Sequence, residues 1–362
     1  MSQLFSPLTI KDVTFRNRIG VSPMCQYSST DGIATDWHMV HLGSRAVGGA
    51  GLIMSEATAI TAQGRITPGC AGIWNDDQVE ALIPVTGFMR EHGAVPGIQI
   101  AHAGRKGSAA KPWDGGQHLH THEGGYETIA AGDQPFDSDG IRLWKTPKMM
   151  TLQEIEQTQN QFAEAAKRSL AAGYKLLEIH AAHGYLLHSF FTPLANNRND
   201  QYGGSFENRA RMLLETTRKV RNVWPENLPL AVRLSAADWD DQGLSIQDNI
   251  EMARNLKALG VDIIDCSAGG ASPASRSSLG NRNADQIGLA ADIREGAGIK
   301  TMAVGTITDP KQAENIIASG QADIALLGRE MLRDPYWPFH AAQTLGVDTK
   351  TVMPVQNSFF VG

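Results

Sequence analysis

Eight short apolar runs, separated by longer amphipathic stretches, limit the fold of this sequence more than any other feature. The runs cover residues 18–24, 51–57, 95–102, 174–180, 229–235, 261–267, 300–305 and 322–328. They do not alternate with polar residues, which is typical of strands covered on both faces, as in a parallel sheet. Helix-like segments lie between them, most clearly at 76–92, 152–172, 207–223, 246–258 and 309–319. Eight strands with intervening helices predict a (β/α)8 TIM barrel of the α/β class, formed by residues 1–362 as a single domain.

The local signals for helix starts agree with this pattern. Thr151 is followed three residues later by Glu154, a capping-box pair whose side chains satisfy free N–H groups of the first helical turn. Asp309 offers a polar cap directly before Pro310, and proline is favoured early in a helix. An open doubly wound sheet is the alternative, but no GxGxxG motif opens a helix after the first strand.

Three segments lie outside the strand and helix alternation. Residues 103–150 form a long stretch rich in Gly, Pro and His, which we expect to cap the barrel after its third strand. The N-terminal stretch "FSPLTIKDVTFRNRI" alternates around Lys11-Asp12 and predicts a hairpin that closes the floor of the barrel. Residues 346–362 form a C-terminal tail.

Composition excludes several classes of protein. The net charge is -6 and no basic block occurs, so nucleic acid is not an expected partner. No apolar run approaches the roughly 20 residues needed to span a bilayer, so we expect no membrane partner. The N-terminal "MSQLFSPLTIKDV" lacks the features of a signal peptide. The three cysteines form no CxxC pair, and together these features predict a cytoplasmic enzyme.

Polar and reactive residues collect where the predicted strands end, which is where TIM barrels carry their active sites. In chain order they are Ser22, Pro23, Met24, Cys25 and Tyr27; Glu56 and Ala57; Gln99, His102, Arg105 and Lys106; His180, His183 and Tyr185; Arg233; Gly305; and Gly328 and Arg329. A glycine after the seventh strand and a Gly-Arg pair after the eighth are suited to binding a phosphate group. The same glycines also suit simple chain turns, so both interpretations stay open.

His180 and His183, in the stretch "EIHAAHG", admit four interpretations. A zinc site would require a third ligand, and neither HExxH nor HxxEH occurs. A nucleophile triad lacks its GxSxG motif. The two imidazoles can also bond nearby backbone in a purely structural role. Finally, they can act as paired donors that polarise a substrate oxygen while Tyr185 supplies a proton. The His118, His120 and His122 series is a further metal candidate, but loop histidines exposed to solvent explain it more simply.

The stretch "EIHAAHGYLLHSFFTPLANNRNDQYGGSFENRARMLLE" at 178–215 closely resembles the signature region of the old yellow enzyme family. The resemblance extends over nearly the whole chain, through "SPMCQY", "GRITPGCAGIW", "GIQIAHAGRK", "RLSAADW" and "GREMLRDPYW". Cys25 followed by Tyr27 is similar to the bacterial subclass that contains the xenobiotic reductases and the thermostable ene-reductases.

This resemblance implies an enzyme that holds FMN non-covalently, is reduced by NADPH and passes hydride to an activated alkene in a ping-pong cycle. The substrates it implies are enones and nitroalkenes, and also nitro compounds, nitrate esters or quinones. The residues that it assigns to the flavin are Ser22, Pro23, Met24, Cys25, Ala57, Gln99, Arg233, Gly305, Gly328 and Arg329. The residues that it assigns to substrate binding are Tyr27, Lys106, His180, His183 and Tyr185, and Tyr185 is the proton donor. Cys25 is expected to tune the flavin potential. No metal ion is expected.

Two other functions stay open, and the sequence differs from the family pattern at some positions. A non-catalytic flavin redox sensor that uses Cys25, and a flavin-free phosphate-handling barrel enzyme, are the other functions that we consider. The family implies a homodimer or homotetramer. Some relatives insert an arginine of the tail into the neighbouring subunit, whereas this chain has Ser358, Phe359 and Phe360 in its tail. Where some xenobiotic reductases have tryptophan on strand seven, this chain has Val304, which bears on substrate shape.

Overall fold

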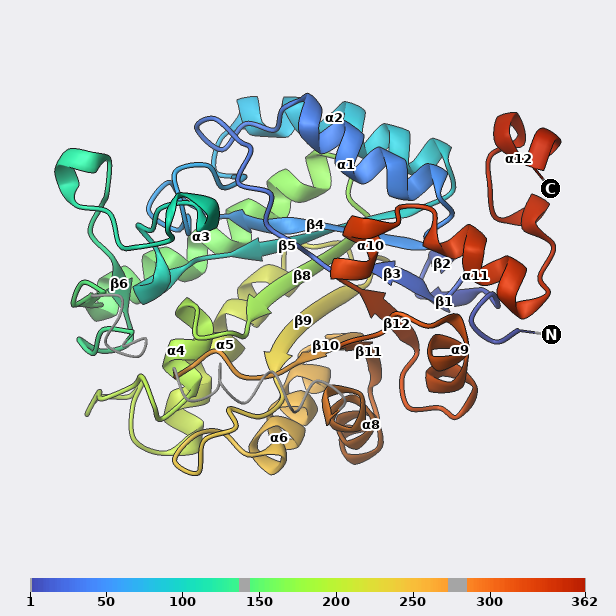
Figure 1. Ribbon diagram of the computed structural model, residues 1–362. Coiled ribbons are helices and arrows are strands. Elements are labelled where there is room, and N and C mark those ends of the chain that lie inside the picture. Colours follow the sequence, from blue (N-terminus) through green and yellow to red (C-terminus); the bar gives the residue numbers. More distant parts are fainter. Residues whose placement is uncertain (1, 137–143, 273–284, 362) are drawn as a thin grey trace.

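The computed structural model describes residues 2–136, 144–272 and 285–361, and its centre is a closed barrel of parallel strands (Figure 1). The barrel strands are β3 (Ile19–Val21), β4 (Leu52–Ala59), β5 (Val95–Ala101), β8 (Leu176–Ala181), β9 (Leu230–Ser235), β10 (Ile263–Ser267), β11 (Lys300–Val304) and β12 (Ile324–Leu327). They pair in chain order, and β12 pairs with β3 to close the ring. The predicted TIM barrel is confirmed, and each strand lies at its predicted run.

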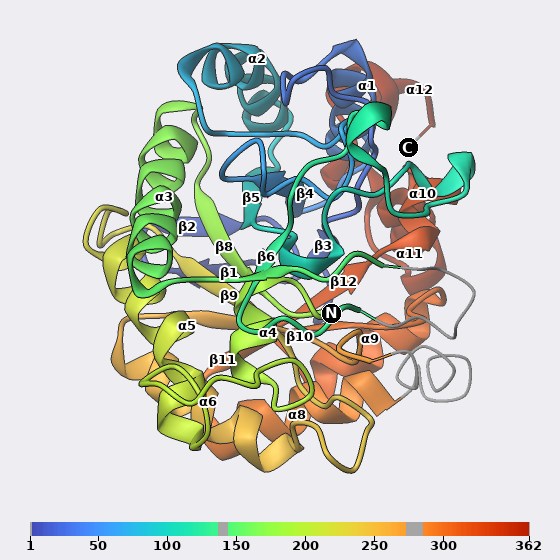
Figure 2. The ribbon, with the colours of Figure 1, turned by 90° about the vertical axis from the view of Figure 1, so that its left-hand side faces the viewer.

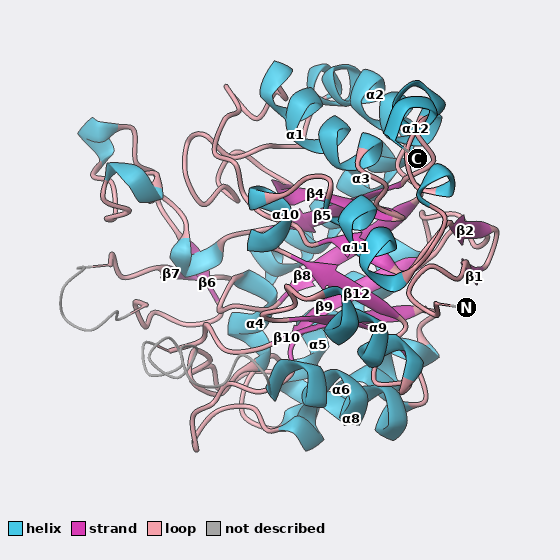
Figure 3. Cartoon of the chain, turned by 45° about the vertical axis from the view of Figure 1, so that its right-hand side comes forward, coloured by secondary structure: helices cyan, strands magenta, loops and turns pink. Residues whose placement is uncertain are grey.

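Helices surround the barrel, as the cartoon in Figure 3 shows. They are α1 (Asp36–Val47), α2 (Asp76–Glu91), α3 (Leu152–Ala171), α5 (Phe206–Arg221), α6 (Ile246–Ala258), α8 (Asp285–Ala297), α9 (Pro310–Ala318) and α11 (Trp337–Leu345). Shorter helices are α4 (Leu186–Phe191), α10 (Arg329–Arg333) and α12 (Val355–Val361). Within the described ranges, no helix combines the length and the apolar character needed to cross a bilayer.

The sequence signals explain these elements. Every residue of β4, β5, β8, β9 and β10 is buried, which is why these runs do not alternate. Thr151 accepts a hydrogen bond from the Glu154 backbone N–H, and Glu154 accepts one from the Thr151 N–H, so the predicted capping box forms at the start of α3. Asp309 caps α9 through the Gln312 N–H at 2.9 Å.

The segment between β5 and β8 contains little regular structure. It holds the single-turn helices η1 (Gly104–Lys106), η2 (Pro112–Asp114) and η3 (Thr121–Glu123) and the parallel pair β6 (Ile129–Ala130) and β7 (Lys148–Met149). Residues 137–143 of the predicted cap lie outside the described residues. Figure 2 views the molecule from this end, and the segment lies in front of the barrel strands.

The predicted N-terminal hairpin forms at the opposite end of the barrel (Figures 1 and 3). Its strands β1 (Leu8–Ile10) and β2 (Val13–Phe15) are antiparallel, and Phe15 is fully buried. In the C-terminal tail, the single-turn helix η4 (Thr349–Thr351) precedes α12. Phe359 and Phe360 on α12 are 77% and 82% exposed, whereas Ser358 beside them is buried.

Candidate active site

The predicted site residues gather at the carboxyl ends of the barrel strands. Ser22 follows β3, and its backbone N–H donates to the Leu327 carbonyl at 2.9 Å, which ties the first strand end to the last. Ala57 does not end its strand as the sequence predicted, because β4 continues to Ala59. The register of β4 against β5 shifts between Ser55 and Ala57, so a bulge at Glu56 takes up the extra length.

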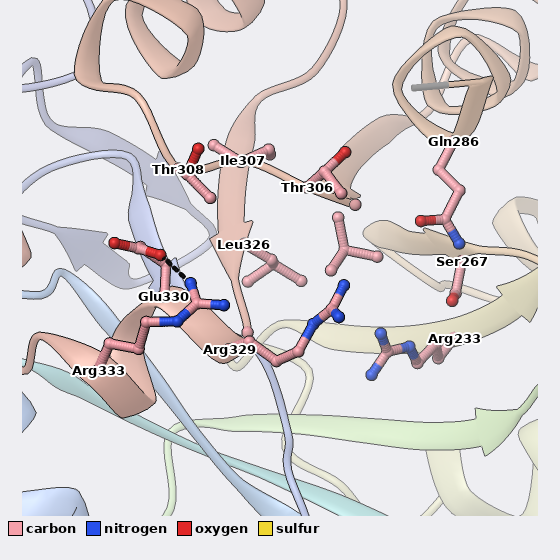
Figure 4. Close-up of a pocket in the computed structure, with 13 residues that line it drawn as sticks. Arg233, Ser267, Gln286, Thr306, Ile307, Thr308, Leu326, Arg329, Glu330 and Arg333 are labelled. Atoms are coloured by element: carbon pink, nitrogen blue, oxygen red, sulfur yellow. Dashed lines mark hydrogen bonds and ion pairs between the residues drawn. The ribbon is translucent and has the colours of Figure 1, made fainter. Parts of the chain in front are cut away.

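One cavity, of about 380 Å³, lies at the ends of β9 to β12 (Figure 4). The residues that line it are Arg233, Ser267, Gln286, Val304, Gly305, Thr306, Ile307, Thr308, Leu326, Gly328, Arg329, Glu330 and Arg333. In Figure 4 the side chains of Arg233 and Arg329 point toward one another. Arg333, the third arginine, is paired with Glu330. This concentration of guanidinium groups suits an anionic ligand such as a phosphate ester.

The backbone around this cavity requires glycine at the predicted place. Gly305 has a φ of 127°, a conformation that residues with a side chain rarely adopt. Gly328 would meet only Met24 Sδ, at 3.7 Å, if it carried a Cβ. The backbone therefore leaves open space beside Gly328, as close approach of a bulky ligand requires.

Arg233 is buried between a hydroxyl group and a carboxylate. Its Nη2 lies 3.4 Å from Ser22 Oγ, and its Nε lies 3.2 Å from Asp265 Oδ2 on the neighbouring strand. Because Asp265 is fully buried, this ion pair is far less screened than a surface pair. The positive charge of Arg233 is thus held in place at the edge of the cavity.

His180, His183 and Tyr185 cluster at the end of β8. The ring centroid of His180 lies 5.2 Å from that of His183 and 5.0 Å from that of Tyr185, in edge-to-face arrangements. Burial, and then the charge of Arg233, lower the pKa of both histidines well below the ordinary value. Both imidazoles are therefore neutral at physiological pH.

Hydrogen bonds constrain which ring nitrogens carry hydrogen. The Ala182 backbone N–H donates to His180 Nδ1 at 3.2 Å, so in the neutral ring the hydrogen is on Nε2, which is a donor. His183 Nε2 lies 2.7 Å from Ser267 Oγ. Ser267 also lines the arginine-rich cavity, so it connects that cavity with the histidine pair.

The turn that carries these side chains is fixed on both sides. His183 has a φ of 59°, and its backbone N–H donates to Ser235 Oγ at 2.9 Å. The Gly184 N–H donates to His188 Nδ1 at 2.8 Å, and His188 Nε2 lies 3.1 Å from Asp238 Oδ1. The buried Asp238 carboxylate thus lies beside the histidine that orients the turn.

A second cavity, of about 290 Å³, opens beside Tyr185 under the 103–150 segment. Tyr27, Lys106, Phe136, Trp144 and Tyr185 are among the residues that line it. Lys106 Nζ donates to the His183 carbonyl at 2.7 Å and lies 5.1 Å from the centroid of the Tyr185 ring. The predicted substrate residues Tyr27, Lys106 and Tyr185 are therefore brought together in one chamber, with the aromatic side chains of Phe136 and Trp144 in its wall.

Cys25 is half-buried next to the Glu56 carboxylate. Burial, and then the charge of Glu56, raise the pKa of the Cys25 thiol well above its ordinary value, so the thiol is protonated at neutral pH. Glu56 in turn accepts from the Gln26 backbone N–H at 3.0 Å, which fixes the chain directly after Cys25.

Several residues at the site were not predicted from the sequence. They are Glu178, His188, Ser235, Asp238, Asp265, Ser267, Gln286 and Arg333, each identified by a contact or by its place in a cavity wall. Two of them had a visible signal, because Glu178 and Asp265 are carboxylates inside apolar strand runs. An acidic residue in such a run is rarely buried unless it is paired. The described residues contain no group of three or more His, Cys, Asp or Glu side chains placed to hold a metal ion.

Comparison with known proteins identifies the family. The sequence profile of the NADH:flavin oxidoreductase / NADH oxidase family matches residues 3–348. The NADPH dehydrogenase of Geobacillus thermodenitrificans is 44% identical over 355 residues, which are 98% of this chain and 97% of that protein.

Solved structures agree with this match. An old yellow enzyme homologue from Zymomonas mobilis has a TM-score of 0.76 and 26% identity, covering 94% of this chain and 92% of its own. 2-Naphthoyl-CoA reductase has a TM-score of 0.84 and 26% identity over 97% of this chain, which spans only 53% of that longer protein. The resemblance to old yellow enzymes is confirmed, and the chain belongs to the NADH:flavin oxidoreductase / NADH oxidase family of FMN-dependent oxidoreductases.

Proposed function

We propose that this protein is an NADPH-dependent ene-reductase that reduces activated C=C bonds, such as those of α,β-unsaturated carbonyl compounds and nitroalkenes. The observation that carries the proposal is the pair of neutral imidazoles, His180 and His183, between the arginine-lined cavity and the chamber beside Tyr185. NADPH as the reductant is supported by the name of the Geobacillus relative. Nitro compounds, nitrate esters and quinones are further substrates within the same proposal.

The residues present fit FMN. We assign its phosphate to Gly305, Gly328 and Arg329, because an arginine and two glycines there offer a cation and unobstructed backbone. Arg233 supplies a permanent positive charge for the flavin ring. The other residues that we assign to the ring are Ser22, Pro23, Met24, Cys25, Ala57 and Gln99. Bound FMN supplies the redox chemistry, taking a hydride from NADPH and giving one to the substrate.

His180 and His183 bind the carbonyl or nitro oxygen of the substrate. Hydride addition to an activated alkene builds negative charge on this oxygen, and neutral N–H donors aimed at it lower the barrier. A protonated histidine is not required, which agrees with the lowered pKa of both rings. Tyr185 then gives a proton to the carbon that did not receive the hydride, as a general acid. Tyr27 and Lys106 complete the substrate chamber.

The experiment that tests the function is NADPH oxidation under anaerobic conditions with 2-cyclohexenone as the acceptor. We expect turnover that depends on both compounds and yields cyclohexanone. A purified yellow protein that consumes NADPH without reducing any enone or nitroalkene would favour the alternative, a non-catalytic redox sensor based on Cys25. Colourless protein that takes up no FMN would favour a flavin-free phosphate-handling barrel.

We also propose that NADPH and the alkene occupy the same chamber in turn, giving ping-pong kinetics. Stopped-flow traces that require both compounds to be bound before the flavin absorbance changes would contradict this. A cytoplasmic homodimer or homotetramer is our proposal for the assembly, and the exposed Phe359 is the tail residue that we expect to contact a neighbouring subunit. Sedimentation of the full-length protein and of Phe359→Ser tests this contact.

A further inference from the structure

Two buried carboxyl groups face each other inside the barrel beside Arg233. Glu178 on β8 and Asp265 on β10 are both 0% exposed and flank the strand that carries Arg233. Asp265 is paired with Arg233 in the register of the sheet, and Glu178 is paired with Gln99 on β5. The cluster therefore links two side chains that we assign to the flavin site, Gln99 and Arg233.

The hydrogen bonds of this cluster do not balance if both carboxyl groups are ionised. Gln99 Nε2 donates to Glu178 Oε1 at 2.7 Å. Among the described residues, Glu178 Oε2 and both oxygens of Asp265 receive no hydrogen bond, and the Arg233 Nε contact with Asp265 is an ion pair without hydrogen-bond alignment. Buried oxygens without a donor are costly. The two carboxyl groups are in contact, so a proton on one of them allows it to donate a hydrogen bond to an oxygen of the other.

The electrostatics point the same way. Burial, and then the Asp265 charge, raise the pKa of Glu178 well above its ordinary value. Burial also raises the pKa of Asp265, while Arg233 opposes that shift. Because the arginine contacts Asp265 directly, the negative charge stays there and the proton goes to Glu178.

We propose that Glu178 and Asp265 are positioning residues of the flavin site: Glu178 is protonated and donates to the Asp265 carboxylate, which holds Arg233. With this proton the three side chains carry no net charge, whereas two ionised carboxylates would leave the cluster negative beside the cofactor. A reduced flavin carries more negative charge than an oxidised one, so the charge of this cluster bears directly on the flavin potential. Among the described residues, His180, His183 and Cys266 are the other titratable groups that act on these three side chains, and the pKa shifts keep each of them neutral.

The decisive variant is Glu178→Gln, which copies the shape and the neutral charge of a protonated glutamic acid. Its amide can still accept from Gln99 and donate to Asp265. We expect the midpoint potential of the bound FMN to be unchanged and the FMN dissociation constant to stay within about twofold of the wild type. If Glu178 were ionised, the same substitution would remove a negative charge and raise the potential, which would overturn the proposal.

Infrared spectroscopy of the apoprotein tests the proton itself, without the cofactor. The wild type should show the C=O stretching band of a buried carboxylic acid at neutral pH, and Glu178→Gln should remove it. Absence of the band from the wild type, or its survival in Glu178→Gln, would refute the shared proton.

Asp265→Asn supplies the contrast, because it removes the charge that the proposal places on this residue. We expect it to raise the flavin potential and to change FMN affinity by about tenfold, as removal of one partner of a buried ion pair is costly. Asp323→Asn is the matched control, since Asp323 forms an ion pair with Arg294 at 2.9 Å outside both cavities. It should lower the melting temperature and leave the potential unchanged. If Glu178→Gln and Asp265→Asn raised the flavin potential equally, the assignment would be contradicted. If Asp265→Asn does not fold, the potential of Glu178→Gln and the infrared band still test whether Glu178 is protonated.

Discussion

At the scale of single residues, the site combines a permanently charged arginine with neutral histidine donors. Arg233 holds a permanent charge at the edge of one cavity, while the nearby His180 and His183 are kept neutral by burial and by that same charge. A neutral imidazole is a weaker acid than imidazolium, so it stabilises a developing oxyanion by donating a hydrogen bond and keeps its proton. Tyr185 adjoins the pair as the separate proton donor that we propose.

The histidine pair gives the first prediction. His180→Ala and His183→Ala should each slow reduction of 2-cyclohexenone by about 10²-fold, the usual cost of removing one donor to an oxyanion. Binding of phenolic ligands, followed by changes in the flavin absorbance, should weaken in parallel, while FMN stays bound. His340→Ala, at an exposed His340–Asp334 pair, is the control and should retain activity. Recovery of either variant by added zinc would show that the pair is a metal site.

Tyr185 gives the second prediction. Tyr185→Phe removes the phenol and keeps the ring, so it should slow the half-reaction with enone by about 10²-fold or more, as expected for loss of a general acid. Reduction of the flavin by NADPH needs no such proton and should proceed at the wild-type rate. Stopped-flow measurement of the two half-reactions separates these effects. Unchanged enone turnover would mean that the proton comes from another group.

At the scale of elements, the turn after β8 positions His183 beside His180, the two donors that we propose. Its backbone is held by Ser235 on β9 and by His188 on α4, which is in turn paired with Asp238. The strands and the capped helices were predictable because their signals are local: apolar runs, Thr151 with Glu154, and Asp309 before proline. The contacts of the turn with Ser235 and Asp238 were not, because each joins residues about 50 positions apart, such as His183 and Ser235.

Gly184 gives a prediction at this scale. It has a φ of 74°, and a Cβ there would lie 2.3 Å from the Gly270 carbonyl oxygen. Gly184→Ala should therefore displace the turn and lower enone reduction by about tenfold or more while FMN remains bound, because small misplacements of catalytic groups are costly. Gly87→Ala is the matched control: Gly87 is in α2 with nothing within 4 Å of the added Cβ. That control should keep full activity and gain about 0.5–1 kcal/mol of stability, measured by urea unfolding.

At the scale of the whole molecule, the barrel brings predicted residues from seven strands to one end. Some of them line the arginine-rich cavity and others line the cavity beside Tyr185. These residues were predictable from the sequence, because parallel strands of a barrel bring their carboxyl ends to one face. Glu178 and Asp265 were not, because their side chains lie inside the barrel below that face and their pairing follows from the stagger between neighbouring strands. The walls of the arginine-rich cavity are likewise a product of packing, since Ser267 and Gln286 join Arg233 there.

Buried neutral histidines should make the folded protein less stable at acidic pH. Burial lowers the pKa of His102 from 6.5 to about 4 and that of His41 to about 3, so the unfolded chain binds protons at pH values where the folded chain does not. Their contribution to stability is complete above pH 6.5 and is lost as the pH falls toward 4. Each such group should lower the free energy of unfolding by up to about 1.4 kcal/mol per pH unit in that window.

Urea unfolding of the apoprotein at pH 7.5, 6.5, 5.5 and 4.5 measures this loss. His102→Asn should flatten the dependence, because Asn does not titrate and its side-chain oxygen can accept the Gly104 N–H that His102 Nδ1 accepts at 3.1 Å. Equal slopes for His102→Asn and the wild type would mean that His102 is protonated in the folded state, and the acid sensitivity would then have to come from other groups, such as the buried His41.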